Sequence, residues 1–394
     1  MKQLAVWLVI FGACCLSIRS AAQVAVPFKA KNGDSISTVY IWHSDTLREV
    51  QKDSVSIQSL FGHVKLQSDK TFFYCDSLAM NHKENFIEAF GNVHINDNDS
   101  TDIYSQYMKY FVDTKYIVFQ KKVTLKDGRG TLSTEELTYD MNLHIGNYLN
   151  NGKVVNQQTT VTSKEGTYYA DTKDVYFKKD VLLKDPAYDL TADSLLYNSD
   201  QQLATFITTT FIRDSSGRTI RTKEGFYDLK NHRAQFGKRP TIKDGSQAIT
   251  ADDIHFDDSV GLSTATGNAV YRDTAQGFSV IANSLVADKK NNTLLATQKP
   301  LMILKGDKDS IYIRADTLFS GKIPDSVLNR TDSVQGMPIV KTARNPNDSS
   351  LRFLQAYHHV RIFSDSLQAV ADSLYYSGMD SIFRLYINPI AWAG

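Results

Sequence analysis

Histidine is the residue of this sequence best suited to bind a metal or to transfer protons, and its nine copies are scattered along 394 residues. His358 and His359 are the only adjacent pair, and no His-x-x-x-His or Cys-x-x-Cys spacing occurs. In a strand, which is the conformation expected there, neighbouring side chains point to opposite faces and cannot share one ion. We therefore predict no metal site and no cofactor.

Acidic residues next to hydroxyl residues are the second possible source of chemistry, as in Asp76-Ser77, Asp193-Ser194 and Asp372-Ser373. Calcium-binding roll repeats would need glycine-dense nine-residue periods, which are absent. A glycosidase would need one pair of carboxylates, whereas these residues recur along almost the whole chain. We expect them to face outward or to cap turns, and we predict no catalytic residue and no enzymatic activity.

The acidic residues belong to a repeated phrase, seen most clearly as Ala192-Asp193-Ser194-Leu195-Leu196-Tyr197. Its fourth residue, the anchor, returns roughly every thirty residues, with one longer gap before the last copy. A fixed period of this length is typical of a stacked repeat protein. The anchors are Leu47, Leu78, Met108, Leu137, Gly166, Leu195, Gly225, Ile254, Leu285, Leu318 and Leu374.

A second phrase follows the anchors by 15 residues in several copies, for example Gly91-Asn92-Val93-His94-Ile95 after Leu78. Both phrases alternate apolar with polar residues, and both are rich in β-branched and aromatic residues, which favours strands. Polar turn clusters lie between them. The sequence therefore predicts an all-β fold, an elongated stack of about eleven two-strand units.

The apolar residues of the two phrases share one parity, so we expect them to face the interior. They either fill a dry core or line an elongated groove for acyl chains, and periodicity does not separate these alternatives. The predicted groove-lining residues are Leu78, Val93, Ile95, Met108, Tyr110, Val123, Leu125, Leu137, Tyr139, Tyr168, Val181, Leu183, Leu195, Tyr197, Tyr227, Ile254, Phe256, Leu285 and Leu318.

The N-terminus has the pattern of a secretion signal, with Lys2 before an apolar run and small residues before Gln23. We predict a signal peptide over 1–22, a linker over 23–35 and a repeat domain over 36–394, interrupted by a loop at about 322–352. A lipid anchor at Cys14 is a weaker alternative. Net charge is +1 with interleaved signs, which argues against nucleic-acid binding.

Eleven copies of the first phrase, several of them followed by the second, behind a secretion signal resemble the OstA-like family, which includes the periplasmic lipopolysaccharide-transport protein LptA and the N-terminal domain of LptD. The resemblance covers roughly residues 36–394. It implies a V-shaped antiparallel β-jellyroll in the periplasm, whose open groove carries the acyl chains of lipid A toward the outer membrane. It also implies like-folded partners at the inner and outer membranes, with head-to-tail association. The glycines at two anchors, Gly166 and Gly225, depart from the pattern.

Two other classes of function fit the repeat. A parallel β-helix, as a surface adhesin or a polysaccharide-acting enzyme, shares the period and the strand-rich composition, but its strands pair in parallel. A closed stack with a dry core would serve as a periplasmic scaffold. Bound lipid distinguishes transport from the scaffold.

Overall fold

The computed structural model describes residues 24–29, 36–52, 55–98, 100–306, 309–323 and 352–393, and all of its regular elements are strands. They form two compact units, residues 1–117 and 118–394. The predicted all-β fold is confirmed. The β-helix alternative is wrong, because the ladders between described strands are antiparallel, for example between β5 and β6 and between β24 and β25. Among the described residues, no helix is long and apolar enough to cross a membrane.

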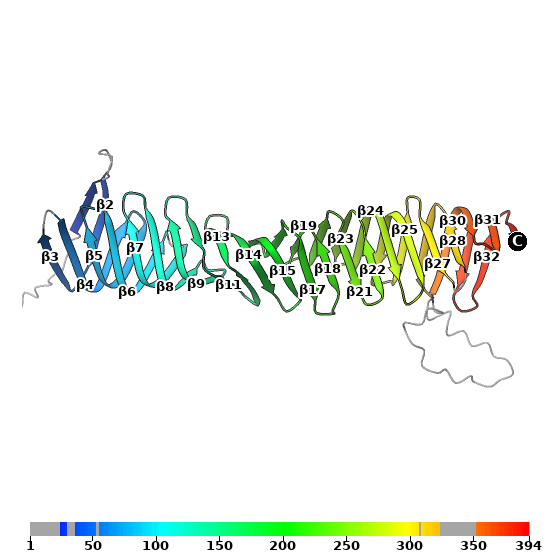
Figure 1. The fold of residues 1–394 in the computed structure, drawn as a ribbon, viewed down its shortest axis with the longest axis horizontal. Coiled ribbons are helices and arrows are strands. Elements are labelled where there is room, and N and C mark those ends of the chain that lie inside the picture. The colour runs from blue at the N-terminus through cyan, green and yellow to red at the C-terminus, as the bar shows by residue number, and fades with distance from the viewer. Residues whose placement is uncertain are drawn as a thin grey trace, which may run out of the picture. The chain divides into compact units, whose positions relative to one another are not determined.

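The N-terminal unit is a set of hydrogen-bonded hairpins (Figure 1). Both β2 and β3 pair with β4, and β4 to β7 follow as antiparallel neighbours. Its strands are β1 (Val24–Lys29), β2 (Ile36–His43), β3 (Thr46–Lys52), β4 (Val55–Ser68), β5 (Thr71–Asn81), β6 (Phe86–Asp97) and β7 (Thr101–Phe111). The strand β8 (Tyr116–Lys126) contains the boundary between the units.

The predicted signal peptide and linker both fall at the start of this unit. The expected linker over 23–35 contains β1, which pairs with β2 and buries Val26 and Phe28. Alternation of apolar residues there was sufficient to form a strand, so the linker prediction does not hold for these residues. The predicted signal peptide over 1–22, with Cys14, lies outside the described residues.

The C-terminal unit continues the hairpins, but many of its strands are interrupted in the middle, which explains why there are more strands than the two per repeat that the sequence predicts. They are β9 (Thr131–Asp140), β10 (Ile145–Tyr148), β11 (Gly152–Asn156), β12 (Thr159–Ser163), β13 (Glu165–Tyr169), β14 (Asp174–Lys184), β15 (Tyr188–Asn198), β16 (Leu203–Phe206), β17 (Thr210–Asp214), β18 (Thr219–Thr222), β19 (Glu224–Asp228), β20 (Arg233–Gly237), β21 (Thr241–Asp244), β22 (Gln247–Thr250), β23 (Asp253–Asp257), β24 (Leu262–Asp273), β25 (Phe278–Asp288), β26 (Thr293–Thr297), β27 (Leu301–Lys305), β28 (Ser310–Arg314), β29 (Thr317–Lys322), β30 (Arg352–Phe363), β31 (Leu367–Ser377), β32 (Ile382–Tyr386) and β33 (Ile390–Ala393).

The predicted loop at about 322–352 connects two paired strands. Lys322 at the end of β29 lies opposite Arg352 at the start of β30, so the two ends of the insertion are neighbours. Residues 324–351 between them lie outside the described residues.

The strands bend in the middle, at two consecutive residues with positive φ. Gly91 and Asn92 have φ of 73° and 42°, and the register of β6 against β7 shifts there. Glycine and asparagine tolerate this left-handed region better than other residues. The Asn92 amide donates a hydrogen bond of 3.0 Å to the carboxylate of Asp76 in the repeated phrase. The Gly-Asn phrase is therefore the bend of a strand, and the aspartate of the repeat caps the bend on the neighbouring strand.

Each strand or strand pair runs between two rows of turns, which we call the margins. In the C-terminal unit the first margin comprises the turns after β8, β11, β14, β17, β21, β24, β27 and β30. The second margin comprises those after β9, β13, β15, β19, β23, β25 and β31. The Tyr168 hydroxyl, near the second margin, donates a 2.8 Å hydrogen bond to Asp127 of the first. Since an extended strand of eleven residues would separate its ends by about 35 Å, the bent halves must face each other.

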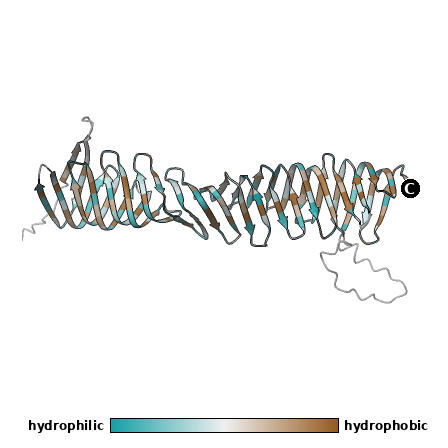
Figure 2. Ribbon diagram, viewed as in Figure 1, coloured by the Kyte–Doolittle hydropathy of each residue, from teal (hydrophilic) through white to brown (hydrophobic). Residues whose placement is uncertain are grey.

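The core lies between these halves, and apolar residues alternate with polar ones along the strands (Figure 2). Strand β5, for example, buries Phe73, Cys75, Leu78 and Met80. Burial raises the pKa of the Cys75 thiol to about 12, so this cysteine stays protonated and packs as an apolar side chain.

Candidate functional site: an apolar cavity in the C-terminal unit

The C-terminal unit has two sections, which differ in the size of the side chains along one line of interior residues. Opposed residues of successive strands form a continuous line, which we call the interior column. In residues 118–237, the closed section, the column contains large aromatic rings. In residues 241–323 and 352–386, the open section, alanine takes their place. The column runs Tyr148, Gly166, Phe177, Leu195, Phe206, Gly225, Phe236, Ile254, Ala265, Leu285, Ala296, Leu318, Ala356, Leu374 and Leu385.

The two glycine anchors are explained by this column. A Cβ atom added to Gly166 would lie 2.4 Å from the ring of Tyr148. Gly225 lies between Phe206 and Phe236, at a φ of 131°, and an added Cβ would lie 2.0 Å from the carbonyl oxygen of Gln235. Both glycines therefore allow the backbone and the neighbouring rings of the closed section to approach closely.

The margins of the closed section are joined by direct contacts. Besides Tyr168 and Asp127, the Asn156 amide donates a 3.3 Å hydrogen bond to the Tyr197 hydroxyl. Arg129 forms a 3.0 Å ion pair with Asp200. In contrast, from β27 onward no hydrogen bond or ion pair joins the two margins among the residues that the structure describes.

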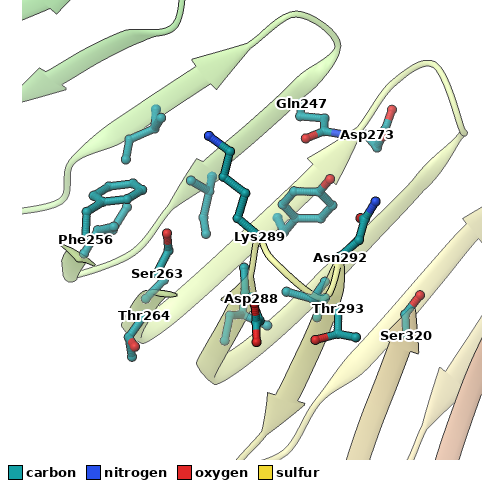
Figure 3. Close-up of a pocket in the computed structure, with 18 of the residues that line it drawn as sticks. Gln247, Phe256, Ser263, Thr264, Asp273, Asp288, Lys289, Asn292, Thr293 and Ser320 are labelled. Carbon is teal, nitrogen blue, oxygen red and sulfur yellow. Dashed lines mark hydrogen bonds between the residues drawn. The ribbon is translucent and has the colours of Figure 1, made fainter. Parts of the chain in front are cut away.

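A cavity of about 280 Å³ lies where the aromatic rings of the column end (Figure 3). Its wall is formed by the inward face of strands β21 to β26, and its apolar lining residues are Ile242, Ile249, Ile254, Phe256, Ala265, Tyr271, Phe278, Leu285, Ala287 and Leu294. Ala265 occupies the column position that Phe236 fills in the preceding repeat. The cavity thus exists because alanine leaves volume that an aromatic ring occupies elsewhere.

Polar side chains surround the opening of this cavity. Asp273 accepts a 3.2 Å hydrogen bond from the Gln247 amide at the first margin. Lys289 and Asn292 lie on the second margin, and Figure 3 shows all four around the same space. The Arg352 guanidinium donates a 3.2 Å hydrogen bond to the side-chain amide oxygen of Asn292. Burial lowers the pKa of this guanidinium, and the charges of Tyr271 and Asp273 raise it in part, so Arg352 interacts with both margins.

The nineteen predicted groove residues lie in the interior, but only three of them line the cavity. All are buried except Tyr227 and Phe256, which are half-buried. Ile254, Phe256 and Leu285 line the cavity, whereas residues of the closed section such as Leu195 pack among other side chains. Whether any of them contacts lipid stays a prediction.

Sequence reasoning missed several cavity residues, including Ile249, Phe278 and Leu294. They lie outside the two repeated phrases from which the prediction was drawn. The sequence signal for this region is that Phe236 in one repeat is followed by Ala265 at the same position of the next repeat. Neither residue is an anchor, so a search based on the anchors does not find it.

The histidine pair is divided between two carboxylates. His358 and His359 have φ of 62° and 53°, so they form the bend of β30 and do not follow the strand geometry expected from the sequence. The His358 ring lies 3.3 Å from Asp372, and the His359 ring lies 2.8 Å from Asp316. Among the described residues, no three His, Cys, Asp or Glu side chains are grouped as metal ligands would be.

Comparison with known proteins identifies the first part of the repeat region. Residues 36–193 match the model of a family described as OstA-like protein. The OstA-like resemblance is thus confirmed over these residues, which are less than half of the chain. The cavity lies beyond the matched residues, in the continuation of the same repeat.

A solved structure is also similar to part of the chain. It is that of LptH, described as the LptA-homologous periplasmic component of the lipopolysaccharide transport device of Pseudomonas aeruginosa. The identity is 12%, the alignment covers 36% of this chain and 82% of that chain, and the TM-score is 0.26. No curated protein matches the chain.

Proposed function

We propose that this protein is a periplasmic lipid-binding bridge component, which holds acyl chains of lipopolysaccharide in an apolar groove on their way to the outer membrane. The family match over residues 36–193 supports this class of protein. The observation that carries the proposal is the cavity at Ala265, where an otherwise filled apolar interior becomes accessible.

The physical need for such a groove follows from the hydrophobic effect. Each buried methylene is worth about 0.8 kcal/mol, so one fourteen-carbon chain costs roughly 10 kcal/mol to expose to water. A lipid with several such chains does not cross an aqueous compartment unaided. A protein interior with a repeated apolar lining removes this cost without any covalent chemistry.

A bridge also requires contact with like-folded partners. Strand β33 pairs with β31 along one edge, and its Ile390 and Trp392 are each 53% exposed. Strands with exposed apolar side chains favour contact with another apolar strand. The proposed partners are other jellyroll components at the inner and outer membranes, or a second copy of this chain in head-to-tail contact.

Site-specific photo-crosslinking tests the proposal. Phe256 lines the cavity and His255, its neighbour on β23, is exposed. Replacing Phe256 with p-benzoylphenylalanine conserves an aromatic ring and should capture lipopolysaccharide when the protein is expressed in a bacterium. The same replacement of His255 is the matched control.

Two results would contradict the proposal. Equal capture at Phe256 and His255 would show that the lipid does not enter the interior. Absence of lipid from both, together with none found by mass spectrometry of the purified protein, would favour a structural scaffold.

A further inference from the structure

The opening of the cavity carries cations without matching ion pairs. Three cations line the cavity, and one of them, Arg218, is paired with Asp214 at 2.7 Å. Neither Lys289 nor Arg352 forms an ion pair among the described residues. Arg352 is half-buried, and its printed hydrogen bond goes to the neutral side chain of Asn292. Burying part of a guanidinium is unfavourable, and among the described residues the compensation includes the charge of Asp273 but no ion-pair contact, so an anionic ligand in the cavity would add to it.

The two lining carboxylates are already engaged by turns. Asp273 accepts hydrogen bonds from the Ser246 hydroxyl at 3.0 Å, from Gln247, and from the backbone N–H groups of Ala275 and Gln276. Asp288 accepts one from the backbone and one from the side chain of Asn291. Three of the four hydrogen bonds to Asp273 end on its Oδ1 atom and one on Oδ2, so this carboxylate is held by its own turn, and its charge reaches Arg352 without an ion-pair contact.

The apolar lining and the two cations share one cavity. Ile249, Ile254 and Leu285 form the wall, and Lys289 and Arg352 line the same space. A ligand that satisfies both parts has a hydrocarbon chain and an anionic end. Guanidinium groups pair with carboxylate and phosphate through two parallel hydrogen bonds, which makes either anion a suitable head group.

We propose that this cavity is a binding site for a single hydrocarbon chain with an anionic head, and that Arg352 and Lys289 bind the phosphate or carboxylate of that head. The inference rests on the proposed function, because it assumes that a lipid chain enters the interior. The inference adds a specific binding site to that function, at which two cations recognise the charge of the head group.

Calorimetric titration of the full chain tests the head group separately from the chain. The probes are dodecyl phosphate, dodecanoate, dodecanol and inorganic phosphate. The variants are Arg352→Gln, Lys289→Gln and Arg352→Lys, with Arg314→Gln as the control because Arg314 is an exposed cation on β28. Arg352→Gln should weaken dodecyl phosphate binding about tenfold, as expected for loss of a charged hydrogen bond. Arg352→Lys should retain part of the affinity, and Arg314→Gln should leave it unchanged.

Each outcome decides the matter. Tighter binding of dodecyl phosphate or of dodecanoate than of dodecanol, lost in the Arg352 and Lys289 variants, supports the site, and the tighter of the two anions identifies the source of the charge. Dodecanol bound as tightly as the anions would overturn head-group recognition and leave the lipid-binding function standing. Inorganic phosphate bound as tightly as dodecyl phosphate would overturn the role of the chain. No binding of any dodecyl probe would count against both proposals. If Arg352→Gln melts at a lower temperature, the exposed Lys289→Gln supplies the same comparison.

Discussion

The closed and open sections of the C-terminal unit share one backbone plan and differ in what fills it. Both bend their strands at paired residues with positive φ, such as Lys179 and Asp180 in one and Gly267 and Asn268 in the other. The closed section places Phe177 at the centre of a packed interior, and the open section places Ala265 at the equivalent position next to a cavity. Identical strand pairing therefore supports either a core or a binding space.

The two sections also differ in the contacts that join their margins. Tyrosine, asparagine and arginine side chains join the margins of the closed section, so its interior has little access from outside. At the cavity, Arg218 lies 5.2 Å above the ring of Phe256, and this contact joins the margins without filling the space between them. Side-chain volume at one column position and polar contacts at the margins therefore together decide whether the stack is open.

The largest expected effect comes from emptying the closed section. Phe177 has no exposed surface, so Phe177→Ala should remove about 3–5 kcal/mol from the free energy of unfolding. Phe211→Ala is the control, since Phe211 is 52% exposed on strand β17 of the same section, and it should change stability by about 0.5 kcal/mol or less. Urea unfolding followed by circular dichroism measures both. Similar small effects for the two variants would mean that the closed interior is not a packed core.

Filling the cavity of the open section should reduce ligand binding with little loss of stability. Ala265→Phe restores the ring that the column lacks, so it should reduce binding of dodecyl phosphate at least about tenfold, which corresponds to 1.4 kcal/mol. Ala269 is also fully buried but does not line the cavity, and Ala269→Phe should cost about 1–3 kcal/mol of stability through overpacking. Unfolding and titration of both variants test this. If Ala265→Phe lowers the free energy of unfolding as much as Ala269→Phe does, the cavity at Ala265 does not have room for a phenyl ring.

Much of the architecture follows from the sequence because its causes are local and repeated. The bends are only partly marked by a motif, since they occur at pairs as different as Gly91-Asn92 and His358-His359. Alternation predicts the strands and the fixed period predicts their stacking, so the all-β stack is predictable from the sequence. The candidate site is not, because it depends on absence of volume. Ala265 resembles any buried alanine until the structure aligns it with Phe236. Arg352 follows a long insertion, and its position beside Asn292 results from pairing of β29 with β30.

Alkaline pH provides the smallest and most selective test of the comparison. Burial raises the pKa of Tyr148 and of Tyr197 in the closed section to about 12, against about 10 in an unfolded chain. Above pH 10 the unfolded state therefore loses these protons first, and stability falls as pH rises toward 12. The double variant Tyr148→Phe, Tyr197→Phe should lose about 1 kcal/mol per hydroxyl at neutral pH, and its melting temperature should fall less steeply between pH 10 and 12. Burial also raises the pKa of Tyr271 in the open section to about 12. Because Tyr271 is present in both the unmodified protein and the double variant, it contributes equally to the pH dependence of both melting temperatures. Equal slopes would show that Tyr148 and Tyr197 do not carry the alkaline sensitivity, which would then lie with other buried tyrosines such as Tyr188.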